Sequence, residues 1–160
     1  MQIIRKRAIV DDDFVHVPDG AELPPTDVKP IVTLARYRDQ AGQLVERYPT
    51  LGVRITSDKL PSDIAQIQRL ALIAIEFPRF TDGRGYSVAR MLRERHGFTG
   101  ELRAVGWVLR DQLHYMERCG FDAFELQPGK SLESALEAFA EFTVSYQSAA
   151  DEKRPLYRRR

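Results

Sequence analysis

The residues of this chain best suited to chemistry form one short stretch, residues 80–87, with the sequence FTDGRGYS. Its two glycines permit backbone conformations closed to other residues, and Asp82 or Ser87 can cap a following helix. Arg84 adds a fixed positive charge near that helix's N-terminus, where unpaired backbone N–H groups already favour anions. The stretch predicts an anion-binding turn. A simpler turn, in which Arg84 pairs with a nearby carboxylate, accounts for the same residues.

Charge is spread unevenly along the chain. The 160 residues have a formal net charge of +1, which argues against wholesale polyanion binding. Residues 79–110, however, contain seven arginines, no lysine and three acids. Guanidinium groups offer planar pairs of donors that suit carboxylate, phosphate, sulfate or sulfite. This segment favours an oxyanion or a carboxylate-rich partner surface as its ligand, and a solvated helix face is the plainer interpretation.

The usual signatures of catalysis and metal binding are missing. The Gly83-Arg84-Gly85 run lacks the third glycine of a dinucleotide fingerprint, and no phosphate loop is present. Three histidines, His16, His96 and His114, show no metal-ligand spacing, so no metal site is expected. Cys119 is the only cysteine, which excludes an internal disulfide and suits a reducing cytoplasm. At a helix C-terminus its thiol is expected to be packed rather than nucleophilic.

Alternating strand and helix patterns predict the elements that position these residues. They indicate an α/β fold with an open, mainly parallel sheet of about five strands, helices on both faces and a small N-terminal hairpin. Five strands are too few to close a barrel. The expected strands are 31–34, 52–56, 71–77, 101–105 and 121–126; the helices are 35–48, 62–70, 87–96, 108–119 and 131–146; the hairpin pairs 2–4 with 8–10.

One domain is expected, because 160 residues with 43% hydrophobic content bury one core. We expect a hairpin and extended connector over 1–30, a single α/β domain over 31–150 and a flexible basic tail over 151–160. Nucleic acid is disfavoured as the tail's partner, since no stacking surface or binding motif accompanies it. No apolar run is long enough to span a bilayer and no export signal is visible, so a cytoplasmic protein without membrane contact is expected.

Ligands of open α/β sheets collect at the carboxyl ends of strands. If strands 71–77 and 101–105 are neighbours, the loops after them bring Arg84, Trp107 and Asp111 towards one crevice, together with Arg103. Arg103 lies within a strand, where pairing with an acid is favoured over exposure. The candidate ligand-binding residues are Asp82, Gly83, Arg84, Gly85, Tyr86, Ser87, Arg90, Arg103, Trp107 and Asp111.

The run from Ile75 to Leu126 contains the phrases FPRFTDGRGYS, GELRAVG, LRDQL and RCGFDAF. This run resembles a bacterial domain family of unknown function that is described as an oxidoreductase of sulfite reduction. The resemblance implies a role in sulfate assimilation beside sulfite reductase, without a catalytic assignment for any residue. Trp107 stands where the family commonly carries an aspartate, which weakens any scheme that needs an acid directly after Gly106.

Together these observations predict an accessory protein that acts with sulfite reductase and binds an anionic ligand or acidic partner surface through Arg84, Arg90 and Arg103. The alternative is a flavin-dependent oxidoreductase or electron-transfer protein, with phosphate at residues 83–87 and Trp107 or Tyr86 stacking on the ring. A single cysteine cannot ligate an iron–sulfur cluster unaided. A phosphate-ester enzyme is disfavoured because no general base or metal set is visible. The ligand, the oligomeric state and catalysis itself stay open.

Overall fold

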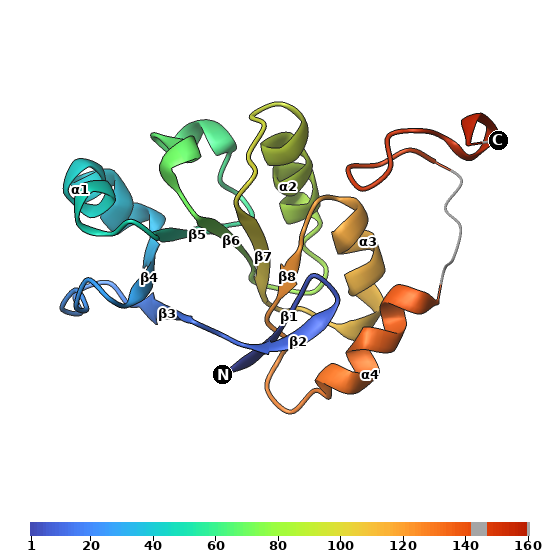
Figure 1. Ribbon diagram of the computed structural model, residues 1–160, viewed down its shortest axis with the longest axis horizontal. Coiled ribbons are helices and arrows are strands. Elements are labelled where there is room, and N and C mark those ends of the chain that lie inside the picture. Colours follow the sequence, from blue (N-terminus) through green and yellow to red (C-terminus); the bar gives the residue numbers. More distant parts are fainter. Residues whose placement is uncertain (142–146, 160) are drawn as a thin grey trace.

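A computed structural model describes residues 1–141 and 147–159 and organises them around one curled sheet (Figure 1). Within these residues the sheet has eight strands in the order β2-β1-β8-β7-β6-β5-β4-β3. Neighbours from β3 to β8 are parallel, and β1 is antiparallel to β2 and β8. The strands are β1 (Gln2–Arg5), β2 (Ala8–Asp11), β3 (Phe14–Val17), β4 (Lys29–Thr33), β5 (Gly52–Thr56), β6 (Leu72–Phe77), β7 (Glu101–Gly106) and β8 (Ala123–Phe124).

The curl follows from the chain connection between the two edge strands. β2 and β3 lie at opposite edges of the sheet, yet only Asp12 and Asp13 separate them in sequence. A link this short spans at most about 11 Å, so the two edges must approach each other. Among the described residues no pairing joins β2 to β3, so the sheet is curled but is not a closed barrel.

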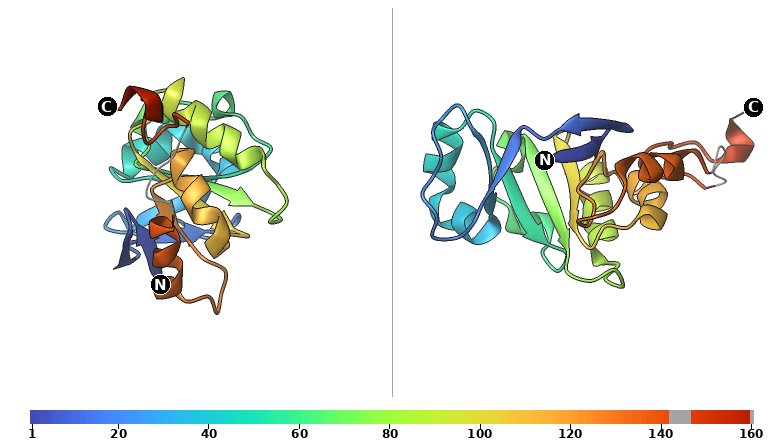
Figure 2. Two further views of the ribbon diagram at one scale, coloured as in Figure 1. Left: turned by 90° about the vertical axis from the view of Figure 1, so that its right-hand side faces the viewer. Right: turned by 90° about the horizontal axis from the view of Figure 1, so that it is seen from below.

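The helices lie outside the curl (Figures 1 and 2). From β4 to β8, each strand lies next to the one that precedes it in sequence, so the sheet grows in one direction. Because the crossovers between parallel strands are right-handed, this order places every connection on the same face of the sheet. The expectation of helices on both faces is therefore wrong. The helices are α1 (Leu34–Arg47), α2 (Arg84–Glu94), α3 (Leu113–Arg118) and α4 (Leu132–Glu137). No helix in the described part of the chain is long and apolar enough to cross a membrane.

All five strands predicted in the body lie in the sheet, and the N-terminal hairpin is confirmed. The sheet is nevertheless larger than predicted, because the hairpin joins it through β8 and because β3 was missed. Residues 62–70, expected as a helix, instead form two short 3₁₀ turns, η1 (Pro61–Asp63) and η2 (Ile67–Arg69).

Two further helices, those expected over 108–119 and 131–146, differ from the prediction at one end. The 108–119 helix begins as a 3₁₀ turn, η3 (Arg110–Gln112), before α3. The 131–146 helix is seen as α4 and η4 (Ala138–Ala140), and its last part, 142–146, falls outside the described residues. The structure places a further 3₁₀ turn, η5 (Leu156–Arg158), in the segment expected to be a flexible tail, whose flexibility stays a prediction.

The two faces of the sheet differ in chemistry. On the convex face, side chains such as Ile55, Phe77 and Leu102 join the helices in the main apolar core. Alternation along a strand sends every second residue to the concave face. There, a small apolar group includes Leu72 and Ala74, and Arg103 lies opposite Ala74 in the register of β6 and β7. The concave face is therefore the place where this sheet buries charge.

Candidate functional site

The turn between β6 and α2, residues 78–83, is held by the carboxylate of Asp82. Asp82 Oδ1 accepts hydrogen bonds from the Arg84 backbone N at 3.1 Å and from Arg84 Nε at 3.0 Å. Asp82 Oδ2 accepts bonds from Arg84 Nη2 and Ser57 Oγ, each at 2.7 Å. The bonds from Arg84 and then Ser57 hold the pKa of Asp82 well below its ordinary value. The carboxylate therefore stays ionised and fixes the Arg84 guanidinium beside the start of α2.

Neither glycine of this turn has an unusual backbone conformation, and Gly85 serves packing. Gly83 has φ −83° and Gly85 lies within α2, so neither uses the left-handed region. A Cβ on Gly85 would lie 2.6 Å from Phe77 Cζ, so its missing side chain lets α2 approach β6 closely. At the end of β7, Gly106 has φ +86° and a Cβ there would meet the Phe77 carbonyl oxygen at 2.5 Å.

These close approaches bring the loops after β6 and β7 together. The Trp107 backbone N donates to the Phe77 carbonyl at 2.8 Å, and Gln112 Nε2 donates to the Phe80 carbonyl at 3.1 Å. The side chains of Phe80 and Trp107 remain 59% and 46% exposed. Two exposed aromatic rings therefore flank the carboxyl edge of the sheet.

An open cavity of about 590 Å³ lies at the turn and is lined by Pro78, Arg79, Thr81, Asp82, Gly83 and Arg84. The Arg84 side chain is 62% exposed despite its ion pair. Arg79 is exposed and has neither an ion pair nor a side-chain hydrogen bond within the described ranges. The cavity thus presents two guanidinium groups and a single carboxylate, an arrangement that favours a negatively charged group.

The structure does not gather all the predicted residues at this cavity. β6 and β7 are neighbours, so the adjacency assumed from the sequence is confirmed. Arg90, however, points its guanidinium to Glu94 one turn along α2, with Nε and Oε1 2.8 Å apart, and lines a different cavity. Asp111 lines a third cavity, with Ser131 among its neighbours. Of the predicted residues, only Asp82, Gly83 and Arg84 line the turn cavity, and Trp107 lies at the same edge of the sheet.

Tyr86 and Ser87 lie in the first turns of α2 rather than in the cavity lining. The Tyr86 ring packs against Phe77 and Tyr115, with centroids 5.3 and 5.2 Å apart. Burial raises the pKa of Tyr86 to about 12. Its ring faces are thus engaged by other rings, and Trp107 is the more accessible of the two predicted stacking residues.

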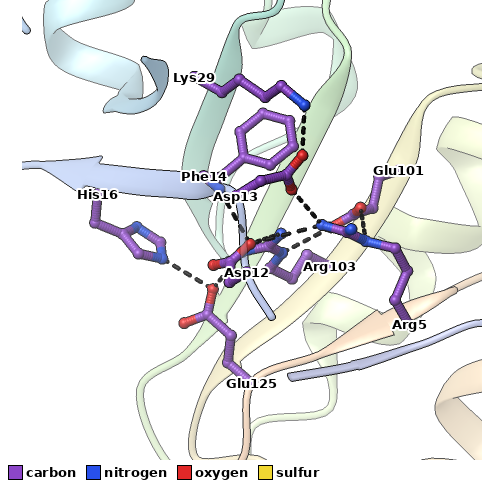
Figure 3. A network of polar contacts seen from close by, with 9 residues as sticks. All are labelled: Arg5, Asp12, Asp13, Phe14, His16, Lys29, Glu101, Arg103 and Glu125. Atoms are coloured by element: carbon purple, nitrogen blue, oxygen red, sulfur yellow. Dashed lines mark hydrogen bonds and ion pairs between the residues drawn. The ribbon is translucent and has the colours of Figure 1, made fainter. Parts of the chain in front are cut away.

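Arg103 belongs to a network of charges on the concave face, shown in Figure 3. Its side chain is fully buried and its guanidinium donates to Asp12 at 2.8 and 2.9 Å, to Glu125 at 2.8 Å and to Glu101 at 2.7 Å. Burial alone would lower the pKa of Arg103, but these carboxylates raise it above its ordinary value. The expected pairing of Arg103 with an acid is confirmed, and its guanidinium is committed to the protein's own groups.

The same network ties the sheet edges to its centre. Asp12 and Asp13 join β2 to β3, and Arg5 on β1 forms ion pairs with Asp13 at 3.0 Å and with Glu101 at 2.8 Å. Lys29 at the start of β4 also bonds to Asp13. Sequence reasoning missed this role of the link, although its signal was present as an acidic run, residues 11–13, between two short apolar strands.

His16 also enters the network, through a contact between its Nε2 and Glu125 Oε1 at 2.9 Å. His16 lies in β3, and its side chain is only 29% exposed. Across the described residues no group of three or more His, Cys, Asp or Glu side chains is arranged to hold a metal ion.

Comparison with known families adds one match. A family model described as "Bacterial protein of unknown function (DUF934)" covers residues 52–157, about two thirds of the chain. The matched segment begins with β5 and includes the β6–α2 turn, β7 and the loop with Trp107. Asp12 and the first four strands lie before it. Among curated proteins nothing matches the chain.

Proposed function

This chain belongs to that bacterial family of unknown function, and we propose that it is an accessory protein of sulfate assimilation that acts with sulfite reductase. In this proposal the cavity at the β6–α2 turn binds an oxyanion or an acidic surface of the partner. The observation that carries the proposal is the pair of exposed arginines, Arg79 and Arg84, that lines this open cavity at the carboxyl edge of a parallel sheet.

The electrostatics of the turn support anion binding by Arg84. Its ion pair with Asp82 lies mostly in solvent, where such pairs contribute little to stability and are screened by salt. A multiply charged ligand can therefore share or replace the Asp82 contact, while Asp82 keeps its bonds to Ser57 and to the Arg84 backbone N. Arg79 adds a positive charge that no carboxylate in the described part of the chain neutralises.

The proposal relies on fewer arginines than the sequence indicated. Arg103 is buried among three carboxylates, and Arg90 is paired with Glu94 beside another cavity. Neither contributes to the turn cavity. Arg84 therefore remains from the original set, and Arg79 joins it.

The alternative role, a flavin-dependent oxidoreductase or electron-transfer protein, rests on Trp107. Its ring is 46% exposed at the same edge of the sheet as the turn cavity, where it could stack on a flavin ring. The absorbance spectrum of the freshly purified protein separates the two roles. A flavin spectrum supports the alternative, and a colourless protein that binds sulfite reductase supports the accessory role.

Growth of a bacterium that lacks the gene tests the proposed role in the cell. The deletion strain is expected to grow with sulfide, but not with sulfate or sulfite, as its only sulfur source. The parent gene should restore growth on sulfite, whereas Arg84→Glu should not. Arg95→Glu is the matched control, because Arg95 is exposed at the opposite end of α2 and has no ion pair among the described residues.

Two results would contradict the proposal in different ways. Normal growth of the deletion strain on sulfite would remove the role in sulfite reduction. Full restoration by Arg84→Glu would remove the role of the turn and leave the pathway assignment standing. Calorimetric titration of the purified protein with sulfite then distinguishes a free ion from a protein surface as the ligand.

A further inference from the structure

A larger cavity, of about 750 Å³, lies beside the C-terminal half of α2 and contains none of the turn residues 78–84. Its walls come from four separate parts of the chain. These are the β1–β2 turn with Lys6 and Arg7, the end of α2 with Arg90 and Glu94, the approach to β8 with Asp122 and Phe124, and the segment 148–153. Ligand sites of proteins commonly have this size.

Most charges on the cavity walls are paired with one another. Arg7 makes two bonds to Glu117, at 2.8 and 2.7 Å, and Arg90 bonds to Glu94 at 2.8 Å. Two further pairs join Arg93 to Asp122 at 3.1 Å and Arg118, next to the cavity, to Asp151 at 3.7 Å.

Two lysines remain after this pairing. Lys6 and Lys153 are exposed, line the cavity and have no ion pair or side-chain hydrogen bond within the described ranges. Lys6 comes from the β1–β2 turn and Lys153 from the C-terminal segment, so the two ammonium groups belong to different walls. The acids that line the cavity are therefore paired with arginines, and the two lysines have no carboxylate partner within the described ranges.

The backbone around Lys6 is held in place by the body of the protein. Lys6 and Arg7 have φ values of +50° and +61°, in the left-handed region that non-glycine residues rarely adopt. The Lys6 backbone N donates to the Asp122 carbonyl at 2.8 Å, which fixes this turn against the approach to β8. The position of Lys6 at the cavity is thus determined by the fold.

The opposite wall is a strap, residues 147–151, docked on the end of α3. Arg118 Nη2 donates to the Gln147 carbonyl at 2.6 Å, and the Ala150 backbone N donates to the Arg118 carbonyl at 3.0 Å. Ala149 and Ala150 of the strap, with Phe121 and Phe124 of the body, give the cavity an apolar part. A ligand in this cavity would contact both apolar side chains and positively charged groups.

We propose that this cavity is a second binding site, which takes an organic anion of nucleotide size, with its negative group between Lys6 and Lys153 and its uncharged part against the alanines of the strap. The volume exceeds what a small inorganic ion needs, and the apolar wall adds contacts that such an ion cannot use. The site is independent of the β6–α2 turn, because the two cavities share no residue.

Calorimetric titration with ADP, inorganic pyrophosphate and adenosine tests this proposal. ADP is expected to bind more tightly than pyrophosphate, which has no uncharged part to contact the alanines of the strap. Adenosine is expected to bind more weakly than either, because it has no negative group for the two lysines. Lys6→Glu and Lys153→Glu should each weaken ADP binding by about tenfold, since each reverses one of the two unpaired charges. Lys130→Glu makes the same charge change at an exposed lysine outside this cavity and should bind ADP like the parent.

Three outcomes would overturn the proposal: no heat of ADP binding to the parent, unchanged ADP affinity in both cavity variants, or pyrophosphate binding as tight as ADP. If Lys6→Glu disturbs the strained turn, Lys153→Glu still tests the proposal. Lys153 lies in the segment beyond the core, so its replacement should not disturb folding. Arg84→Ala should leave ADP affinity unchanged, so failure here is distinguishable from failure of the proposed role of the turn.

Discussion

Asp12 and Arg103 are 91 residues apart in sequence and meet in a two-bond ion pair, with Asp12 Oδ2 2.8 Å from Arg103 Nη1 and Asp12 Oδ1 2.9 Å from Nη2. Asp12 sits between the two edge strands and Arg103 lies on β7, inside the sheet. Both side chains are almost completely buried, at 2% and 0% exposure. This pair holds the curled sheet across its concave face.

Removing the Arg103 charge should destabilise the protein strongly. Arg103→Met removes the buried cation that Asp12, Glu101 and Glu125 share, a change that costs about 3–5 kcal/mol of the free energy of unfolding. Urea denaturation followed by circular dichroism measures this change. Arg90→Met breaks an exposed pair one turn apart on α2 and should cost about 0.5 kcal/mol or less. Equal stabilities of the two variants would contradict the role assigned to Arg103.

Acid should weaken the same network through Glu125. Burial alone would raise the pKa of Glu125, but bonds from His16 and Arg103 lower it below its ordinary value of 4.5. Because the folded-state pKa is depressed, its contribution to stability is present above pH 4.5 and is lost as the pH falls through the lowered value. Chemical denaturation at a series of pH values should therefore show stability falling below this point.

The variant Glu125→Gln separates this contribution from general acid unfolding. It should be less stable than the parent at neutral pH, yet lose less stability on acidification, because it has no carboxylate to protonate. Glu46→Gln is the control, since Glu46 is exposed and has no ion pair among the described residues. A parent-like acid slope in Glu125→Gln would show that Glu125 does not govern this loss.

Gly85 should resist replacement because of its packing. Gly85→Ala places a Cβ 2.6 Å from the Phe77 ring, and overpacking of this kind costs about 1–3 kcal/mol. Gly42→Ala is the matched control, since Gly42 lies in α1 and a Cβ there has no heavy atom within 4 Å. Helix propensity predicts that Gly42→Ala stabilises the protein by up to about 1 kcal/mol. Thermal unfolding should therefore shift in opposite directions, and a stabilised Gly85→Ala would refute the close approach.

Local pattern predicted the elements of this fold better than their arrangement. Apolar runs such as residues 71–77 and 101–105 are strands buried on both faces, and a short continuous apolar run contains that signal in itself. Gly97 and Gly120 follow the ends of α2 and α3 with φ values of +60° and +110°, in the region that glycine adopts most readily, so these helix ends are also marked in the local sequence. Strand order depends on contacts between residues that are distant in sequence. The order that places all helices outside the curl could therefore not be predicted from the sequence.

For the candidate site, too, the sequence predicted local features better than contacts between distant residues. The turn 80–87 was recognised from its residue types, and the pairing of Arg103 with an acid followed from a charge inside a strand. The identity of the partner could not be predicted, because Asp12 reaches Arg103 only through the curl. Arg90 was grouped with the turn because it is near in sequence, whereas its place on α2 directs it to the other cavity. β3 was missed because its four residues were assigned to the extended, proline-rich connector that follows them.

The proposed function is tested most directly by the affinity of this protein for purified sulfite reductase, measured by surface plasmon resonance at low and physiological ionic strength. The parent should bind, and the double variant Arg79→Ala/Arg84→Ala should bind on the order of tenfold more weakly, while Arg95→Ala matches the parent. Binding of the parent should also weaken as salt screens the contact. Equal affinity of the double variant and the parent, or no binding by the parent, would contradict the account.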